Sequence, residues 1–269
     1  MLFLISKGEN MTNNPIDIEK IIQFYPKAEQ LELRYFESID STNTFAKNHQ
    51  AEFSDQRPTV LVANQQTNGY GRFKRDFYSP AGSGIYLTLV LPIEQKIIPG
   101  LWTLGTGVAV VKALQQFTNN QNIKLKWIND ILLNDHKCGG ILAESISDSA
   151  GKITKIVIGV GLNINTSIFP SELQNIAKSI TEESEVDRNQ IIALLLEQFF
   201  QLDFRTNSFL NDYRQFCDTL GKKIQVINGK QEIVGIADDI LPDGSLVVFD
   251  DKKNRHVINS GEVSKIYFD

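Results

Sequence analysis

The chain has 269 residues, of which 42% are hydrophobic and 22% are charged, and its formal net charge is −5. This composition is typical of a folded soluble protein and excludes an intrinsically disordered chain, and the negative charge argues against a general nucleic-acid binder. No apolar stretch approaches the roughly 20 residues of a membrane helix. Two cysteines, Cys138 and Cys217, cannot form a disulfide framework, so we expect a cytoplasmic protein that does not bind membranes.

The first half of the chain predicts helices and strands in alternation. Residues 1–14 form a tail, and Asp40-Ser41-Thr42-Asn43 is a cluster of residues that favour helix N-caps. Residues 66–80 form a polar, basic loop. Apolar spacing predicts a helix at 16–22, strands at 31–39, 59–63 and 84–91, and a buried helix at 101–117.

The following segment predicts a second group of strands and then two helices. The strands are expected at 123–127, 131–133, 138–144 and 153–158. Asp187 and Gln190 resemble a capping box, which predicts a helix at 191–204. A last helix is expected at 209–216.

The pattern changes after Gly221. Short strands alternate with the turns Asn228-Gly229 and Asp243-Gly244. The strands are expected at 224–227, 232–240, 245–249 and 256–259. We therefore predict a small all-β barrel, with a domain boundary near residue 217.

One loop carries more chemical information than any other segment, namely Gln66-Thr67-Asn68-Gly69-Tyr70-Gly71-Arg72-Phe73-Lys74-Arg75-Asp76-Phe77. Its two glycines allow the backbone to approach a ligand closely, and its three cations lie within four residues. This combination suits an anion such as a carboxylate or a triphosphate. It is neither the dinucleotide fingerprint nor a Walker loop, because a third glycine and a following helix are lacking. The alternative is a solvated basic loop.

Other polar segments have ordinary structural interpretations when each is taken alone. Ser41-Thr42-Asn43 is a helix cap, Lys126-Trp127-Ile128-Asn129-Asp130 is a strand that ends in a turn, and Lys137 is a surface lysine. Gly159-Val160-Gly161-Leu162-Asn163 closes a strand with glycines that allow a close approach, and its ordinary interpretation is a bulge or a turn.

Metal and covalent chemistry find little support in the sequence. His49, His136 and His256 lie far apart and lack the spacing of metal ligands. No Gly-x-Ser-x-Gly elbow is present. Cys138 and Cys217 favour a core role over that of a nucleophile. Catalysis would therefore depend on positioning and charge.

Taken together and in order, five segments resemble those of biotin protein ligases. They are residues 40–43, 66–72 and 126–130, the run Lys137-Cys138-Gly139-Gly140-Ile141-Leu142-Ala143-Glu144, and residues 159–163. The resemblance extends from about residue 33 to the end of the chain. One such motif is a weak signal, but five in the family's order and spacing are a specific one.

The resemblance implies an α+β fold. A catalytic domain like that of class II aminoacyl-tRNA synthetases, a mixed sheet flanked by helices, is expected at residues 33–217. A tail with a short helix at 1–32 precedes it, and an SH3-like barrel at 218–269 follows it. The implied reaction joins biotin and MgATP into biotinyl-5′-adenylate and pyrophosphate, and the biotinyl group then passes to a lysine of a biotin carboxyl carrier protein.

The resemblance also assigns site residues. Those that match the biotin pocket and its wrapping loop are Ser41, Thr42, Asn43, Gln66, Gly69, Tyr70, Gly71, Arg72 and Lys137. Those that fall where the family contacts ATP are Arg72, Arg75, Phe77, Asn129, Asp130, Lys137 and Asn163. Arg72 and Lys137 are the expected catalytic pair, and Asp130 is the candidate ligand of Mg²⁺.

Five positions depart from the family pattern. Tyr70 and Phe73 stand where arginine is frequent, Lys74 where glycine is common, Phe77 in place of tryptophan and Ile128 in place of proline. We expect Tyr70 to contribute mainly its backbone, so this change should be tolerated.

The chemistry of the two steps requires residues of these kinds. A carboxylate must meet a phosphate, and fixed cations are needed because both groups are negative. Short polar groups such as Ser41, Thr42 and Gln66 can satisfy the ureido edge of biotin. The loop at 69–77 is expected to order over the adenylate and exclude water. The group that removes a proton from the acceptor lysine is either Asp130 or solvent, and the sequence leaves both alternatives open.

Two alternatives stay open. A lipoate–protein ligase shares the catalytic fold, although the polar residues expected at the biotin edge favour biotin. A biotin-responsive repressor carries a winged helix-turn-helix before the catalytic domain, whereas only about 32 residues precede it here, so we expect no specific DNA binding. The sequence is compatible with a monomer or a homodimer.

Overall fold

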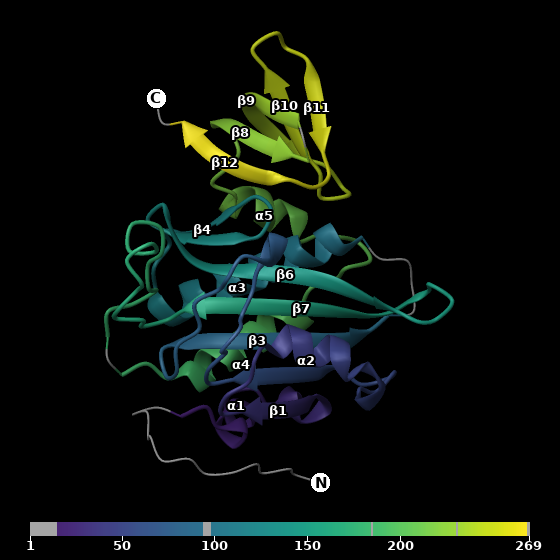
Figure 1. Ribbon diagram of the computed structural model, residues 1–269, viewed down its shortest axis with the longest axis vertical. Helices are drawn as coiled ribbons and strands as arrows, with labels where there is room; N and C mark the ends of the chain where they lie inside the picture. Colours follow the sequence, from purple (N-terminus) through teal and green to yellow (C-terminus); the bar gives the residue numbers. More distant parts are fainter. Residues whose placement is uncertain (1–14, 94–97, 184, 230, 268–269) are drawn as a thin grey trace.

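The computed structural model describes residues 15–93, 98–183, 185–229 and 231–267. The predicted tail at 1–14 lies outside the described residues. Two β-sheets and the helices that cover one of them form the structure (Figure 1).

The larger sheet has seven strands in the order β1-β2-β3-β7-β6-β5-β4. Its strands are β1 (Glu32–Phe36), β2 (Thr59–Ala63), β3 (Gly84–Pro92), β4 (Ile123–Lys126), β5 (Asp130–Leu133), β6 (His136–Ser147) and β7 (Ile153–Asn163). β1 and β2 are parallel, and all other neighbouring strands are antiparallel. The sheet is therefore mixed, as expected.

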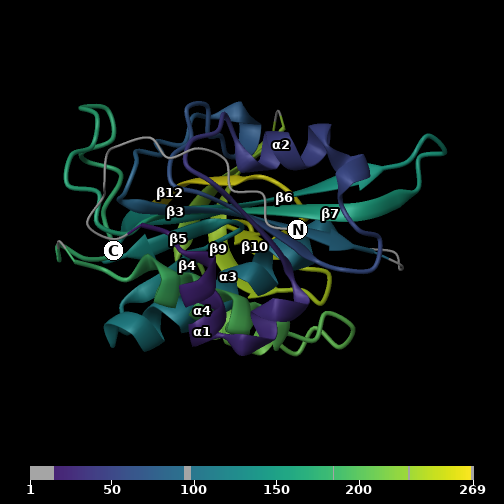
Figure 2. The ribbon, with the colours of Figure 1, turned by 90° about the horizontal axis from the view of Figure 1, so that it is seen from below.

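Helices cover both faces of this sheet. They are α1 (Ile18–Phe24), α2 (Thr42–Asn48), α3 (Pro99–Thr118), α4 (Arg188–Phe200) and α5 (Leu210–Phe216), with short 3-10 helices at η1 (Pro26–Gln30), η2 (Gln50–Glu52) and η3 (Arg72–Lys74). Figure 2 shows α2 alone on one face and α1, α3 and α4 on the other. α3 is buried along most of its length because it packs between the sheet and α4.

The smaller sheet is antiparallel, with strands in the order β11-β10-β9-β8-β12. They are β8 (Lys223–Asn228), β9 (Gln231–Ile240), β10 (Leu246–Asp250), β11 (Arg255–Ile258) and β12 (Glu262–Tyr267). The turn at Gly244 has φ +85°, which favours glycine. The indole nitrogen of Trp127 donates to the carbonyl of Gly244 at 3.1 Å and so joins the two sheets.

The structure confirms the α+β prediction and most elements, but the bounds of several elements differ, and β1 ends at Phe36 rather than at residue 39. α4 ends at Phe200 rather than at 204, because Phe204 leaves the helix to stack on Trp102 with ring centroids 3.9 Å apart. β7 continues to Asn163 in regular register with β3 and β6, so the segment at 159–163 is neither a bulge nor a turn. Strand β12 was not expected.

Candidate functional site

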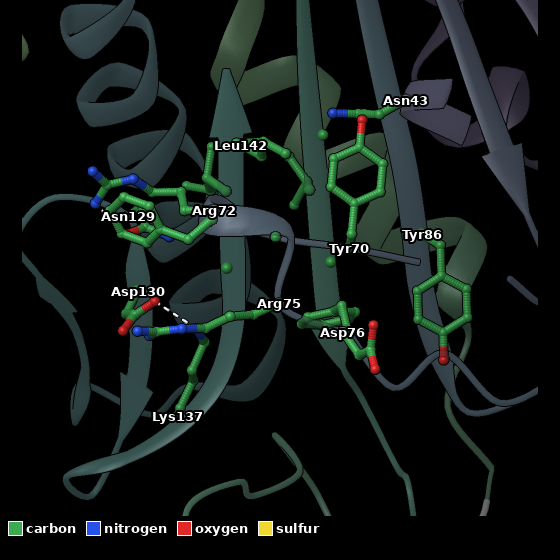
Figure 3. A pocket seen from close by; sticks show the side chains of 18 of the residues that line it. Asn43, Tyr70, Arg72, Arg75, Asp76, Tyr86, Asn129, Asp130, Lys137 and Leu142 are labelled. Carbon is green, nitrogen blue, oxygen red and sulfur yellow. Dashed lines mark hydrogen bonds and ion pairs between the residues drawn. The ribbon is translucent and has the colours of Figure 1, made fainter. Parts of the chain in front are cut away.

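A pocket opens beneath the loop at 66–80, between α2, the β4–β5 turn and strands β6, β7 and β12 (Figure 3). All but two of the predicted site residues line it. They are Ser41, Thr42, Asn43, Gln66, Tyr70, Gly71, Arg72, Arg75, Phe77, Asn129, Asp130 and Lys137. The fold thus gathers segments from four separate parts of the sequence.

One end of the pocket is a network of short polar side chains. Ser41 caps α2 by accepting from the backbone N–H of Thr44 at 3.3 Å. The backbone N–H and the hydroxyl of Thr42 donate to Gln66 Oε1 at 2.9 and 3.1 Å. Ser41-Thr42-Asn43 is therefore both a helix cap, as its ordinary interpretation holds, and a wall of the pocket.

Asn43 is held in this network from two sides. Its Oδ1 accepts from the hydroxyl of buried Thr88 at 2.6 Å. A Cβ at Gly159 would lie 2.5 Å from the same Oδ1, so only glycine leaves room for the amide there. The polar end of the pocket is consequently well ordered, and each of its polar groups has a protein partner to exchange for a ligand.

The other end of the pocket is cationic. Lys137 Nζ lies 2.6 Å from Asp130 Oδ1. Arg72 donates to the carbonyl of Gly261 at 2.7 Å and to Asn129 Oδ1 at 3.4 Å. Burial lowers the pKa of the Arg72 guanidinium, but an arginine stays charged at neutral pH. Arg72 and Lys137, from distant parts of the chain, therefore contact two consecutive residues, Asn129 and Asp130.

The loop between these two ends is folded back on itself. The N–H of Gly71 donates to the carbonyl of Arg75 at 2.8 Å, and the N–H of Phe77 donates to that of Gly69 at 2.9 Å. Phe73 and Lys74, at its tip, both have φ +58°. This left-handed conformation is the physical reason that glycine suits position 74.

Arg75 links the loop to the small sheet. Its guanidinium forms a bidentate ion pair with Glu262 of β12, with 2.7 Å between Nη2 and Oε2. The pair is solvent-exposed on the arginine side. An exposed pair of this kind stabilises a fold by about 0–1 kcal/mol, so it can be exchanged for a ligand at low cost.

The aromatic ring of Phe77 covers β7. A Cβ at Gly161 would lie 2.6 Å from this ring, which shows how closely the ring approaches the strand. Tyr86 packs edge-on against Phe77, with ring centroids 6.5 Å apart. Phe77 therefore presents a fixed aromatic face to the pocket.

Two predicted residues do not line the pocket. Gly69 lies at the base of the loop, where a Cβ would approach Gln66 Nε2 and Ser79 Oγ to 2.7 Å, so it shapes the loop through its backbone. Asn163 is buried at the end of β7, two residues past Gly161, and its carbonyl accepts from Ile180. The structure does not bring Asn163 to the candidate ATP site.

Several residues at the site were not predicted as site residues from the sequence. Asp76, Tyr86, Leu142 and Glu262 line the pocket, and Lys47, Thr88 and Glu144 contact side chains that line it. Glu144 offered a signal, because it is an acidic residue that ends the apolar run after Lys137. The Tyr70 hydroxyl donates to Glu144 at 3.0 Å, so its side chain is engaged with the protein, and a mainly backbone contribution of Tyr70 to biotin stays a prediction.

The cysteines behave as core residues. Both are buried, and burial raises the pKa of the Cys138 thiol to about 12. Such a thiol is not a nucleophile at neutral pH. Within the described ranges, no group of three or more His, Cys, Asp or Glu side chains could hold a metal ion. In the same part of the chain, no helix is long and apolar enough to cross a membrane.

Sequence comparison identifies the family. Residues 35–163 match the biotin/lipoate A/B protein ligase family, and residues 219–266 match the biotin protein ligase C-terminal domain. The biotin–[acetyl-CoA-carboxylase] ligase of Mycobacterium tuberculosis is 31% identical over 237 residues, which are 83% of this chain and 85% of that protein. The chain belongs to the biotin protein ligase family.

Other relatives match over less of their length. The bifunctional ligase/repressor BirA of Bacillus subtilis is 33% identical over 214 residues, 76% of this chain but only 65% of that protein. The fold is shared with the biotin protein ligase of Aquifex aeolicus in complex with biotin and ATP. That structure has a TM-score of 0.73 and 24% identity, and the match covers 86% of this chain and 97% of that one.

Proposed function

We propose that the protein is an ATP-dependent ligase that activates biotin as biotinyl-5′-adenylate and transfers it to a lysine of a biotin carboxyl carrier protein. One observation carries this proposal. The pocket has a polar end built from amide and hydroxyl groups, and Arg72 and Lys137 both line its cationic end. A neutral cyclic urea with a carboxylate at the end of an apolar chain fits both ends.

The polar end suits the ureido group. The backbone N–H and the hydroxyl of Thr42 already donate to Gln66 there, and Ser41 and Asn43 lie beside them. A ligand that lacked the ureido edge would form no hydrogen bonds with these groups and would therefore gain less binding free energy in this partly buried site. This observation favours biotin over lipoate, whose ring carries no such edge.

The cationic end suits the first reaction step. A carboxylate oxygen attacks the α-phosphorus, the new oxygen–phosphorus bond forms, and the bond to pyrophosphate breaks. Arg72 and Lys137 would bind the carboxylate and the phosphate and reduce their mutual repulsion. Phosphoryl transfer needs placement and charge neutralisation more than a nucleophile on the enzyme.

The nucleotide would occupy the part of the pocket between Phe77 and the β4–β5 turn. Arg75 would bind phosphate after release from Glu262, and Asn129 lies next to Arg72. The fixed ring of Phe77 offers an apolar surface for the adenylate.

Magnesium would enter with the triphosphate. Asp130 is a carboxylate of the pocket, and the absence of a three-ligand cluster in the described ranges argues against an all-protein site. Mg²⁺ often binds one or two carboxylates together with substrate phosphates, so these residues fit the ion only when the nucleotide is present. There it would neutralise phosphate charge.

The second step requires a neutral acceptor amine. The amine attacks the acyl carbon, the acyl–phosphate bond breaks, and AMP leaves. A free lysine has a pKa near 10.4, so it must lose a proton first. No histidine is found among the described residues that line the pocket. Asp130 or solvent would accept the proton.

A pyrophosphate-exchange assay tests the proposal. Labelled pyrophosphate should enter ATP when biotin is present and not when lipoate replaces it. Transfer of biotin to a purified carrier domain should follow. Exchange that depends on lipoate alone would favour a lipoate–protein ligase instead.

We further propose that the protein does not act as a specific DNA-binding repressor and that it works in the cytoplasm as a monomer or a homodimer. The net charge of −5 supports the first point. A gel shift with biotin and ATP should show no sequence-specific retention. Retention of one operator sequence would contradict it.

A further inference from the structure

The loop over the pocket is tied to the sheet through Tyr70. The Tyr70 hydroxyl donates to Glu144 Oε2 at 3.0 Å. Glu144 lies on β6, and its other oxygen, Oε1, lies 2.7 Å from Lys47 Nζ of α2. Asn43 Nδ2 donates to Oε2 at 3.2 Å. One carboxylate therefore joins the loop, a helix and the central sheet, and Figure 3 shows the Tyr70 hydroxyl pointing toward Asn43.

The far end of the loop is tied to the same polar network. Gln66 Nε2 donates to Ser79 Oγ at 3.2 Å, and Ser79 Oγ donates to the carbonyl of Phe77 at 2.8 Å. Gln66 also accepts from Thr42, which lies 2.7 Å from the hydroxyl of Thr88. Side chains of the polar network, among them Glu144 and Gln66, thus hold the loop at 69–77 near both of its ends.

The charges favour the Tyr70–Glu144 bond. Glu144 is partly buried, but Lys47 holds the pKa of its carboxyl below the usual range. Burial and the charge of Glu144 raise the pKa of Tyr70, so the phenol keeps its proton at neutral pH. Hydrogen bonds to a charged acceptor are about twice as strong as neutral ones. The ammonium group of Lys74 also lies 4.0 Å from the centre of the Tyr70 ring.

We propose that Tyr70 is a positioning residue that holds the loop closed over the pocket and so retains the acyl-adenylate until the acceptor lysine arrives. The inference rests on the proposed function. Water that reached the adenylate would break its acyl–phosphate bond and release biotin and AMP. Tyr70 opposes this loss through Glu144 and Lys47, without contact with the reacting atoms.

The first test uses the ligand-free protein and does not depend on the reaction. Hydrogen exchange should be compared at the amides of Gly71 and Phe77, whose N–H groups are bonded within the loop. Tyr70→Phe should accelerate exchange there about tenfold. The control is Tyr35→Phe, which removes a similar bond of 2.5 Å from Tyr35 of β1 to Glu37 and should leave the loop unchanged.

The second test measures retention of the adenylate. Enzyme loaded with biotin and labelled ATP, without acceptor, should lose its adenylate about tenfold faster in Tyr70→Phe than in the wild type. In the same variant, the rate of adenylate loss should change by a larger factor than the rate of biotin-dependent pyrophosphate exchange. A merely structural role would lower the melting temperature without separating these two rates.

A double-variant comparison identifies the partner. If the bond to Glu144 carries the effect, Tyr70→Phe combined with Glu144→Gln should release the adenylate no faster than Glu144→Gln alone. Wild-type loop exchange and wild-type retention in Tyr70→Phe would overturn the inference. An inactive wild type would instead overturn the proposed function, while the ligand-free exchange still decides whether Tyr70 holds the loop.

Discussion

Lys137 Nζ lies 2.6 Å from Asp130 Oδ1, and the residue before Asp130, Asn129, contacts Arg72. Asn129 of the β4–β5 turn and Asp130, the first residue of β5, therefore contact two cations that come from distant segments. The proposed function uses these two cations to bind a carboxylate and a phosphate.

Removal of the lysine charge should suppress the first reaction step. Lys137→Ala is expected to lower the rate of biotin-dependent pyrophosphate exchange about 100-fold, the usual cost of losing one group that stabilises developing charge. Binding of biotin alone should change far less, because the polar end of the pocket is intact. An unchanged exchange rate would remove Lys137 from the site.

Removal of the arginine should affect retention of the adenylate. Arg72→Gly loses the guanidinium and its hydrogen bond to Gly261 of the small sheet. The variant should release about tenfold more free adenylate into solution, as measured by chromatography of the filtrate. Arg205→Gly, at an exposed arginine, is the control, and equal release from both variants would argue against a role for Arg72.

Asp130 should matter for orientation more than for stability. Asp130→Asn removes a partly exposed ion pair, so the free energy of unfolding should change by less than about 1 kcal/mol. Pyrophosphate exchange should fall about tenfold, because Lys137 loses its fixed partner. Asp212→Asn breaks a pair with Lys112 of the same length, 2.6 Å, and should leave the exchange rate unchanged. Similar rates in the two variants would contradict this role.

A methyl group on β7 should disturb the nucleotide end of the pocket. Gly161→Ala places a Cβ 2.6 Å from the Phe77 ring, so the ring must move. We expect the KM for ATP to rise about tenfold and the KM for biotin to change less. Gly100→Ala, whose Cβ would come no closer than 3.7 Å to Ile128, is the matched control. An unaltered KM for ATP in Gly161→Ala would show that Phe77 does not shape the nucleotide site.

The stability that the Tyr70–Glu144–Lys47 contact contributes should depend on pH. The pKa of Glu144 in the folded protein is lower than its ordinary value of 4.5, so the stability it contributes is fully present above about pH 4.5. This contribution is lost as the pH falls through the folded pKa. The difference in unfolding free energy between wild type and Glu144→Gln should therefore be constant from pH 5 to 8 and shrink in more acidic solution. If this difference in unfolding free energy grew as the pH fell, it would contradict the predicted direction of the pH dependence.

The sequence predicted the strands of the central sheet well because they are local patterns, and the two residues of the expected cation pair line one pocket. β2 and β3 are continuous apolar runs between clear breakers, and the loop with Arg72 has a specific motif. The partners of that loop could not be predicted in the same way. Glu144 and Glu262 contact it only after the sheet and the small domain have packed, and no spacing rule encodes such long-range pairs.

The end of β7 is a second case in which the sequence alone did not predict the structure. Gly159 and Gly161 suggest a bulge when only sequence is considered, whereas in the structure they are regular strand residues that admit Asn43 and the Phe77 ring. The reason that glycine occupies these two positions follows only from the side chains that approach them in the structure. Asn163 is the opposite case, because it belongs to the segment at 159–163 that resembles the family but does not line the pocket.

A crystal structure of the protein with biotin and a non-hydrolysable ATP analogue tests the central claim most directly. The account predicts the ureido group beside Thr42 and Gln66, and the biotin carboxylate and the α-phosphate each within about 3 Å of Arg72 or Lys137. Biotin bound outside this pocket, or bound with its carboxylate directed away from both cations, would contradict the account.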